Sequence, residues 1–244
     1  MIDQSHPVVQ KFPMSIDLKG KWALVTGSSR GIGVQVARAL AQHGCNLVLH
    51  SRQKAGTAKL EGEIGRQVRV VSLAAELSDQ NQVDRLAKDA LDASGGIDVL
   101  YNNAAIMTPY RKDFATVSAD DYRRSFEVNV IAPIRLTFAL LPSMLNRKFG
   151  RIIQVTSGIK NEPELMAYAA SKAALDKFVL DTAPRLRGTG VTMNLLDPGW
   201  LRTDLGGPKA PNSVESVLPG ALVPALADND LHGQLVRAQD FAGR

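Results

Sequence analysis

Short apolar runs alternate with longer stretches of helical periodicity from Gly20 onward. The apolar runs, such as WALV, NLVL and RIIQV, lack polar alternation, which is typical of parallel strands covered by helices on both faces. The predicted strands are 22–25, 46–50, 68–73, 99–101, 151–156, 191–195 and 234–237. The predicted helices lie near residues 31–43, 55–65, 80–93, 118–146 and 165–187.

This alternation predicts an α/β fold, a single doubly wound Rossmann-like domain of about seven parallel strands with helices on both faces. The domain is expected to span residues 14–244, because no linker or repeat divides that range. Residues 1–13 carry two prolines and no periodicity, so we expect a flexible N-terminal extension. No apolar stretch is expected to be long enough to cross a bilayer. Pro184 predicts that the helix near 165–187 kinks or ends early, because proline removes a backbone donor.

The motif TGSSRGIG, residues 26–33, stands where the first strand hands over to the first helix. Free backbone N–H groups and the positive end of the helix dipole bind phosphate at such a turn. Gly27 would permit the tight turn, Gly31 the approach of a pyrophosphate, and Gly33 the packing of helix against strand. The spacing TGxxxGxG differs from the GxGxxG dinucleotide fingerprint, yet its position after the first strand predicts a dinucleotide site.

Composition narrows the kind of ligand. The chain has 244 residues, 45% hydrophobic and 22% charged, and a net charge of +5. Its Lys and Arg residues are scattered, with no basic stripe interleaved with aromatics, so a small anionic ligand is expected and nucleic acid is not. Cys45 is the only cysteine, which excludes an intrachain disulfide and favours a reducing, cytoplasmic location. We interpret Cys45 as a small buried hydrophobic residue.

Four motifs together resemble one family. TGSSRGIG, NNAA at 102–105, YAASK at 168–172 and DPGWLRTD at 197–204 resemble, in order and separation, the compact NAD(P)-dependent short-chain dehydrogenase/reductases. The resemblance covers the chain from about Asp17 to its end. It implies a small-molecule carbonyl or alcohol substrate, no metal, and a homo-oligomer, tetramer or dimer, built on the helices near 118–146 and 165–187.

The predicted catalytic residues are Asn129, Ser157, Tyr168 and Lys172. Tyr168 and Lys172 are four apart on a predicted helix and share a face, so the ammonium is expected to lower the pKa of the phenol and make it a proton donor or acceptor. The resemblance makes Ser157 the hydroxyl that hydrogen-bonds the substrate carbonyl, with Thr156 as the alternative. It also makes Asn129 the residue that breaks helix regularity and holds a water linked to the lysine.

NADPH is the predicted cofactor, with NADH as the less favoured alternative. An acidic residue at the end of the second strand would hold the ribose hydroxyls of NAD, but Ser51 stands there and Arg52 follows. Arg30, inside the glycine turn, adds a second guanidinium suited to a 2′-phosphate. Glu76 matches a family aspartate near the adenine. The full predicted cofactor-binding set is Gly27, Ser29, Arg30, Gly31, Ile32, Gly33, Ser51, Arg52, Glu76, Leu77, Asn103, Ala104, Tyr168, Lys172, Pro198, Gly199, Leu201 and Thr203.

Three functions are compatible with these residues. The first is the reversible NADPH-dependent reduction of a ketone or aldehyde to an alcohol, with Tyr168 as the proton donor. The second is the reduction of a 3-oxoacyl thioester, such as one on acyl-carrier protein. The third is a non-catalytic NADP(H)-sensing protein. Substrate choice is expected to lie in the loops 158–167 and 200–219.

Overall fold

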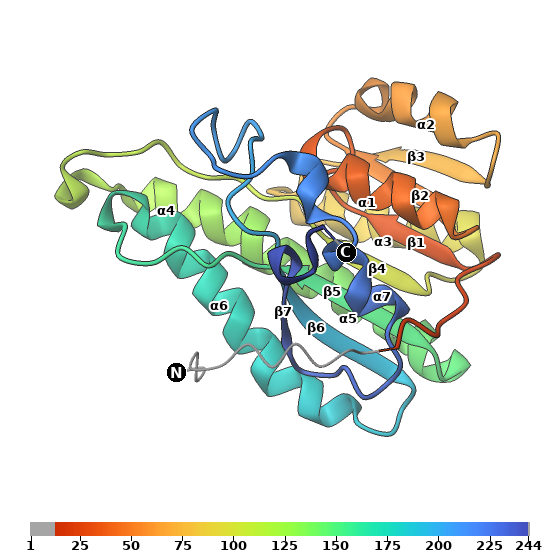
Figure 1. The fold of residues 1–244 in the computed structure, drawn as a ribbon. Coiled ribbons are helices and arrows are strands. Elements are labelled where there is room, and N and C mark those ends of the chain that lie inside the picture. The colour runs from red at the N-terminus through yellow and green to blue at the C-terminus, as the bar shows by residue number, and fades with distance from the viewer. Residues whose placement is uncertain (1–12, 244) are drawn as a thin grey trace.

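Seven strands form one parallel sheet in the computed structural model, which describes residues 13–243. The strands are β1 Trp22–Val25, β2 Asn46–Ser51, β3 Val70–Ala74, β4 Val99–Asn102, β5 Gly150–Val155, β6 Val191–Asp197 and β7 Leu235–Arg237. Their order across the sheet is β3-β2-β1-β4-β5-β6-β7 (Figure 1). The predicted doubly wound α/β fold is confirmed. Of the predicted extension, residues 1–12 lie outside the described residues.

Seven α-helices lie among the described residues. They are α1 Gly31–Gln42, α2 Ala58–Ile64, α3 Gln80–Ser94, α4 Ala119–Phe126, α5 Ala132–Arg147, α6 Met166–Thr182 and α7 Val223–Leu226. A π-helical turn, Glu127–Ile131, joins α4 to α5 without a break in the chain's helical course. Helix α6 ends at Thr182 and is followed by a 3-10 turn that contains Pro184, which confirms the predicted early end.

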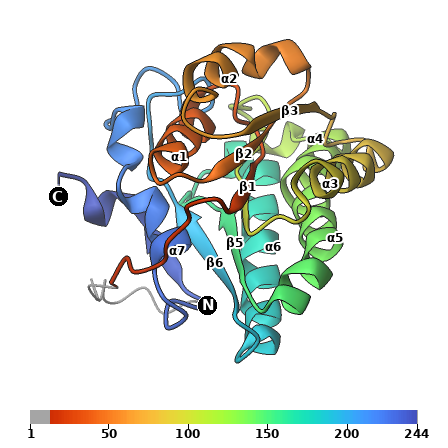
Figure 2. The same cartoon turned by 90° about the vertical axis from the view of Figure 1, so that its right-hand side faces the viewer.

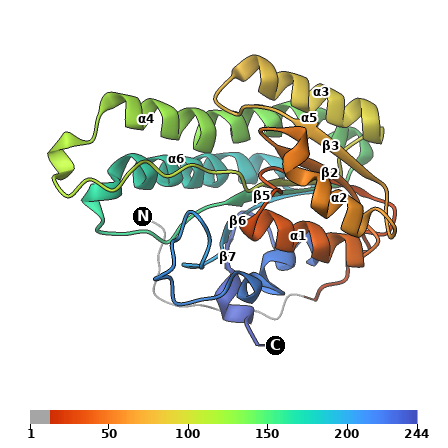
Figure 3. The ribbon, with the colours of Figure 1, turned by 90° about the horizontal axis from the view of Figure 1, so that it is seen from above.

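Helices cover the sheet on both faces (Figures 2 and 3). On one side α1, α2 and α7 pack against Ala23 and Val25 of β1, among other residues. On the other side α3, α5 and α6 pack against Trp22 and Leu24 of the same strand. Successive residues of a strand point to opposite faces. Every position of β1 is therefore buried, which explains the unbroken apolar runs in the sequence.

The helical stretch Ala119–Arg147 corrects one sequence prediction. It is long and apolar enough to cross a membrane by length and composition, with a mean hydropathy of 1.6 over its most apolar 18 residues. Half of that window is buried inside the fold. Leu136, Leu140 and Met144 of α5 are fully buried in the core between α3 and the sheet. Core packing accounts for the buried half of this window.

Cys45, the residue before β2, is fully buried. Its thiol lies 3.4 Å from the carbonyl oxygen of Lys21, and burial, with a smaller effect from Asp98, raises the pKa of the thiol to about 12. A thiol held neutral and covered is a structural residue. The interpretation of Cys45 as a small buried residue is confirmed.

Candidate active site

The predicted site residues gather at the carboxyl ends of the strands. The glycine turn follows β1, Asn103 follows β4, Ser157 follows β5 and Pro198 follows β6. Because all strands are parallel, these ends meet at one edge of the sheet. The strand order reverses between β1 and β4, and open α/β sheets bind ligands in the crevice at such a point.

The three positions of the turn are occupied by glycine for different structural reasons. Gly27 and Gly31 have φ values of +67° and +57°, a conformation that side chains disfavour. A Cβ on Gly27 would lie 2.9 Å from Cα of Ala104, and one on Gly33 would lie 2.3 Å from the carbonyl oxygen of Gly27. A Cβ on Gly31 would meet only Thr203, 3.5 Å away. Gly27 and Gly33 are therefore needed for packing, whereas Gly31 faces the space below the loop that follows β6.

The start of α1 suits an anion. Arg30 is its N-cap, in extended conformation, and the Arg30 side chain forms no capping hydrogen bond. The first turn of α1 carries no acidic residue. Its backbone N–H groups therefore lack a side-chain acceptor, and the helix dipole adds positive potential. A dinucleotide pyrophosphate fits this open cradle.

Thr26 and Asn103 hold the glycine turn against the loop that follows β4. The hydroxyl oxygen of Thr26 accepts hydrogen bonds from the backbone N–H groups of Asn103 and Ala104, both at 3.0 Å. The side-chain amide of Asn103 donates to the carbonyl oxygen of Thr26 at 2.8 Å. Asn102, its neighbour, instead points into the core and donates to the carbonyl oxygen of Pro133 on α5. Asn103 is thus the member of the NNAA motif whose side chain shapes the site.

His50, at the end of β2, has a structural role. It is buried, and its Nδ1 accepts a hydrogen bond from the backbone N–H of Gly27 at 3.1 Å. Its Nε2 lies 3.0 Å from the carbonyl oxygen of Ala75. A neutral ring with its proton on Nε2 satisfies both contacts, and burial lowers the pKa of His50. The only sequence signal was its place at the end of a predicted strand.

The predicted 2′-phosphate residues border the glycine turn. A Cβ on Gly56 would lie 2.9 Å from the Ser51 hydroxyl and 3.4 Å from Cβ of Ser29, so the turn and the end of β2 come together. Arg52 is exposed. Arg30 is also exposed and forms a 2.9 Å ion pair with Asp204 in the loop that follows β6. Sequence reasoning missed this contact, although Asp204 closes the DPGWLRTD motif.

The side chains of two other predicted cofactor residues, Glu76 and Leu77, make contacts within the protein. Glu76 accepts a hydrogen bond from the backbone N–H of Ser78 and so stabilises the turn before α3. Leu77 is buried in the apolar core. The Leu77 side chain therefore packs in the core, and only its backbone groups could contact a ligand.

The loop that follows β6 is fixed over the glycine turn. Gly199 has a φ of +80°, and its N–H donates to Asp197 at 2.9 Å. The carbonyl oxygen of Pro198 accepts from the side chain of Gln239 at 2.9 Å. Leu201 is buried, which anchors the segment that carries Thr203 above Gly31.

Ser157, Tyr168 and Lys172 form a cluster at the carboxyl end of β5. The Ser157 hydroxyl lies near the Tyr168 phenol, close enough to act on the pKa of Tyr168. Nζ of Lys172 donates to the carbonyl oxygen of Val155 at 2.7 Å and lies 5.8 Å from the centre of the Tyr168 ring. The Thr156 hydroxyl instead donates to Asp176 on α6. Of the two candidate hydroxyls, Ser157 is therefore the one beside the phenol.

Burial dominates the electrostatics of this cluster. It raises the pKa of Tyr168, a raise that the Ser157 hydroxyl opposes and the charge of Asp197 strengthens. Burial also lowers the pKa of Lys172 to about 8. The lowering of the pKa of Tyr168 by Lys172 stays a prediction, since Nζ of Lys172 donates to the strand in this structure and burial dominates the pKa of the phenol.

Asn129 lies at the centre of the π turn between α4 and α5, which confirms that helix regularity breaks there. Its Oδ1 accepts from the backbone N–H of Ile106 at 2.9 Å. Its Nδ2 donates to the carbonyl oxygen of Ile106 and to the Ser171 hydroxyl. These contacts use both Nδ2 protons and Oδ1, so the Asn129 side chain ties the loop after β4 to α6. The water link from Asn129 to Lys172 stays a prediction.

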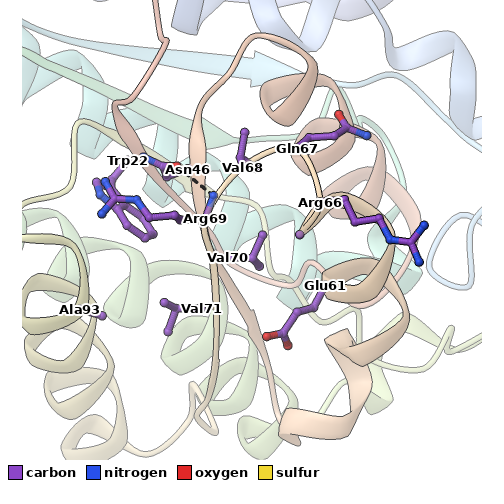
Figure 4. A pocket seen from close by; sticks show the side chains of 11 residues that line it. Trp22, Asn46, Glu61, Arg66, Gln67, Val68, Arg69, Val70, Val71 and Ala93 are labelled. Atoms are coloured by element: carbon purple, nitrogen blue, oxygen red, sulfur yellow. Dashed lines mark hydrogen bonds between the residues drawn. The ribbon is translucent and has the colours of Figure 1, made fainter.

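A cavity of about 750 Å³ lies away from the catalytic cluster, beside the first residues of β1, β2 and β3 (Figure 4). Trp22, Asn46 and Val70, the first residues of β1, β2 and β3, line it, and Arg69 stacks over the Trp22 ring. It is therefore at the amino ends of these strands, whereas ligands of open α/β sheets bind beyond the carboxyl ends. No predicted site residue lines it. Residues 13–243 contain no cluster of three or more His, Cys, Asp or Glu able to hold a metal.

The fold, together with the cluster of Ser157, Tyr168 and Lys172, defines an oxidoreductase of the short chain dehydrogenase family. Residues 21–213 match the family model for short chain dehydrogenases, and the chain belongs to this family. It is 35% identical over 207 residues to a short chain dehydrogenase of Pseudocercospora fijiensis, covering 84% of this chain and 67% of the relative. It is 36% identical over 187 residues to the ketoacyl reductase HetN of Nostoc, covering 75% of this chain and 64% of the relative.

Solved structures show the same fold. A metagenomic short-chain oxidoreductase in complex with NADP has 32% identity and a TM-score of 0.77, covering 91% of this chain and 99% of that chain. A 3-oxoacyl (acyl-carrier-protein) reductase of Agrobacterium tumefaciens with NADP bound has 26% identity and a TM-score of 0.82, covering 97% and 98%. The Rossmann-like sheet predicted from the sequence is thus shared with these enzymes.

The buried His50 should make stability depend on pH. Because burial lowers its pKa in the folded protein, the unfolded chain binds a proton more readily below about pH 6.5, the ordinary value for histidine. The free energy of unfolding should therefore fall as the pH drops through this range. Urea denaturation at several pH values should show that the free energy of unfolding falls less steeply with decreasing pH in His50→Gln than in the wild type. His43→Gln, at an exposed position, should keep the wild-type pH dependence. Equal slopes for wild type and His50→Gln would contradict the assignment.

Proposed function

We propose that this protein reduces a ketone or aldehyde to an alcohol, reversibly, with NADPH. The observation that carries the proposal is the contact of Ser157 with Tyr168 beside a buried Lys172, at the strand ends that also hold the glycine turn. The nicotinamide supplies the hydride. Ser157 hydrogen-bonds the carbonyl oxygen, Tyr168 gives that oxygen its proton, and Lys172 keeps positive charge near the phenolate that results.

The chain's residues favour NADPH over NADH. No carboxylate ends β2, and the end of this strand meets the glycine turn that carries Arg30. Arg30 and Arg52 supply planar donors that match a phosphate. The metagenomic oxidoreductase and the 3-oxoacyl reductase that resemble this chain both bind NADP. Asp204 holds Arg30 in this structure, so a 2′-phosphate would compete with Asp204 for the guanidinium.

Substitution of Tyr168 by phenylalanine tests the reaction. A panel of ketones, aldehydes and alcohols with NADPH or NADP, followed at the nicotinamide absorbance, should identify a substrate. Tyr168→Phe should then lower kcat by about 10² to 10⁴, the usual contribution of a positioned proton donor. Its affinity for NADPH, measured by fluorescence titration, should change little, because the phenyl ring is retained. Undiminished turnover in Tyr168→Phe would refute the mechanism.

Substitution of Arg52 tests the cofactor. Arg52→Asp should raise KM for NADPH by roughly tenfold to a hundredfold, the loss of one charge-assisted contact. Its KM for NADH should rise less, because NADH lacks the 2′-phosphate. Arg66→Asp is the matched control, since Arg66 is exposed and lines the cavity at the far end of the sheet. An unchanged KM for NADPH in Arg52→Asp would rule out this assignment.

Reduction of a 3-oxoacyl thioester is the second candidate. The ketoacyl reductase HetN and the 3-oxoacyl (acyl-carrier-protein) reductase among the similar proteins favour it. Turnover of an acetoacetyl thioester with NADPH separates it from general carbonyl reduction. A purified protein that binds NADPH and turns over neither class would instead support the non-catalytic NADP(H)-sensing role.

We propose further that the chain forms a homo-oligomer through the outer faces of α5 and α6. Phe138 on α5 is 52% exposed and Leu180 on α6 is 40% exposed. The rings of Phe138 and Phe178 meet edge to face, with centroids 5.6 Å apart, so the two helices share one apolar surface. Clustered exposed apolar side chains on a globular domain mark interaction surfaces.

A charge placed in this surface should separate the subunits. Phe138→Glu should shift the molar mass in solution, measured by light scattering after size exclusion, from an oligomer to a monomer. Phe114→Glu is the control, because Phe114 is also exposed, at 60%, but lies outside the helix pair. The surface is not the interface if Phe138→Glu keeps the wild-type mass.

A further inference from the structure

A second cavity, of about 260 Å³, lies between α6 and the loop that follows β5, and Ser157 and Lys172 of the catalytic cluster are among the residues that line it. Lys172 and Asp176 of α6 line it, together with Thr156, Asp197 and Arg237. It is large enough for several waters, since one water occupies about 30 Å³. Neither the sequence motifs nor the proposed reaction uses Asp176.

The end of β5 holds Lys172 and Asp176 in a fixed relation. The carbonyl oxygen of Val155 accepts a hydrogen bond from Nζ of Lys172 at 2.7 Å. The next residue, Thr156, donates its hydroxyl proton to Oδ1 of Asp176. Asp176 also follows Lys172 by four residues on α6, so the two side chains share a helix face. The last residue of β5 and the residue that follows it thus bind two side chains that lie one helical turn apart on α6.

The charged groups around the cavity come from four segments. Helix α6 supplies Lys172 and Asp176, β6 supplies Asp197, β7 supplies Arg237, and the loop after β5 supplies Lys160. Asp197 accepts a hydrogen bond from the backbone N–H of Gly199 through Oδ1, and its charge raises the pKa of Asp176.

Asp176 is the charge that acts on the lysine. Burial lowers the pKa of Lys172 to about 8, and the charge of Asp176 opposes that fall. Burial in turn raises the pKa of Asp176, while the Thr156 hydrogen bond and the charge of Lys172 lower it. A fully covered ammonium with a pKa this close to neutrality depends on each nearby carboxylate for its charge.

We propose that Asp176 is a positioning residue of the active site, whose carboxylate, held by Thr156, keeps the buried Lys172 positively charged beside Tyr168. Asp176 acts through Lys172 and touches neither substrate nor cofactor. Its importance for turnover rests on the proposed reductase function, but its effect on the lysine does not. An isosteric amide at this position would keep the Thr156 hydrogen bond and lose only the charge.

NMR titration of the lysine ammonium groups tests this directly. Protein labelled with ¹⁵N at lysine Nζ is titrated with pH, and Lys172 is assigned by the signal that Lys172→Met lacks. The wild-type midpoint should lie near pH 8. Asp176→Asn should lower the midpoint by about one pH unit, the effect of removing a nearby opposite charge. Asp176→Glu should restore it. Asp181→Asn, which removes an exposed carboxylate paired with Lys177 on the same helix, should leave it unchanged.

The outcomes separate this inference from the proposed function. An equal Lys172 midpoint in wild type and Asp176→Asn would overturn the role of Asp176 even in an active enzyme. A lowered midpoint in a protein that turns over no substrate would support the inference and refute only the reductase function. In an active enzyme, the alkaline limb of kcat should move to lower pH in Asp176→Asn. If Asp176→Asn does not fold, as judged by its thermal transition, the lysine midpoint of Thr156→Val decides: a lower midpoint supports the role, and an unchanged one overturns it.

Discussion

The parallel pairing of β1 with β4 is the constraint on which the site depends. Leu24 and Val25 lie opposite Leu100 and Tyr101, so the glycine turn and the loop after β4 leave the sheet side by side. Thr26 then satisfies the free N–H groups of that loop, and Asn103 closes the turn from the other side. With the strand order reversed at this pair, the helices diverge and leave the crevice in which a dinucleotide fits.

Burial, more than charge pairing, sets the chemistry of the catalytic cluster. The phenol of Tyr168 and the ammonium of Lys172 are both covered, and each shifts toward its neutral form. The phenol therefore stays protonated at neutral pH, and positive charge on Lys172 would be needed to stabilise the phenolate. The same covering makes the lysine sensitive to a carboxylate such as Asp176, because a low-dielectric surround strengthens every remaining charge interaction.

Most of the fold could be predicted from the sequence because parallel strands buried on both faces leave an unmistakable apolar run. The pairing of Tyr168 with Lys172 could also be predicted, since their spacing puts them on one helix face, whereas Ser157 was placed beside them by the family resemblance. The role of His50 could not, because its partners Gly27 and Ala75 lie more than twenty residues away on either side. Thr156 and Asp176 are likewise twenty residues apart, and the pKa of Tyr168 depends on coverage that no local pattern encodes.

The π turn at Glu127–Ile131 links the site to the core by simple helix geometry. A regular helix advances about 100° per residue, so one residue added to a turn rotates everything beyond it by that angle. With this extra residue in place, Asn129 points at Ile106 and Ser171 while Leu136 and Leu140 face the sheet. Deletion of one residue there would restore a regular helix and swing the apolar side of α5 out of the core. The direction of the Asn129 side chain and the packing of α5 therefore depend on the same extra residue. This segment should tolerate substitutions far better than insertions or deletions.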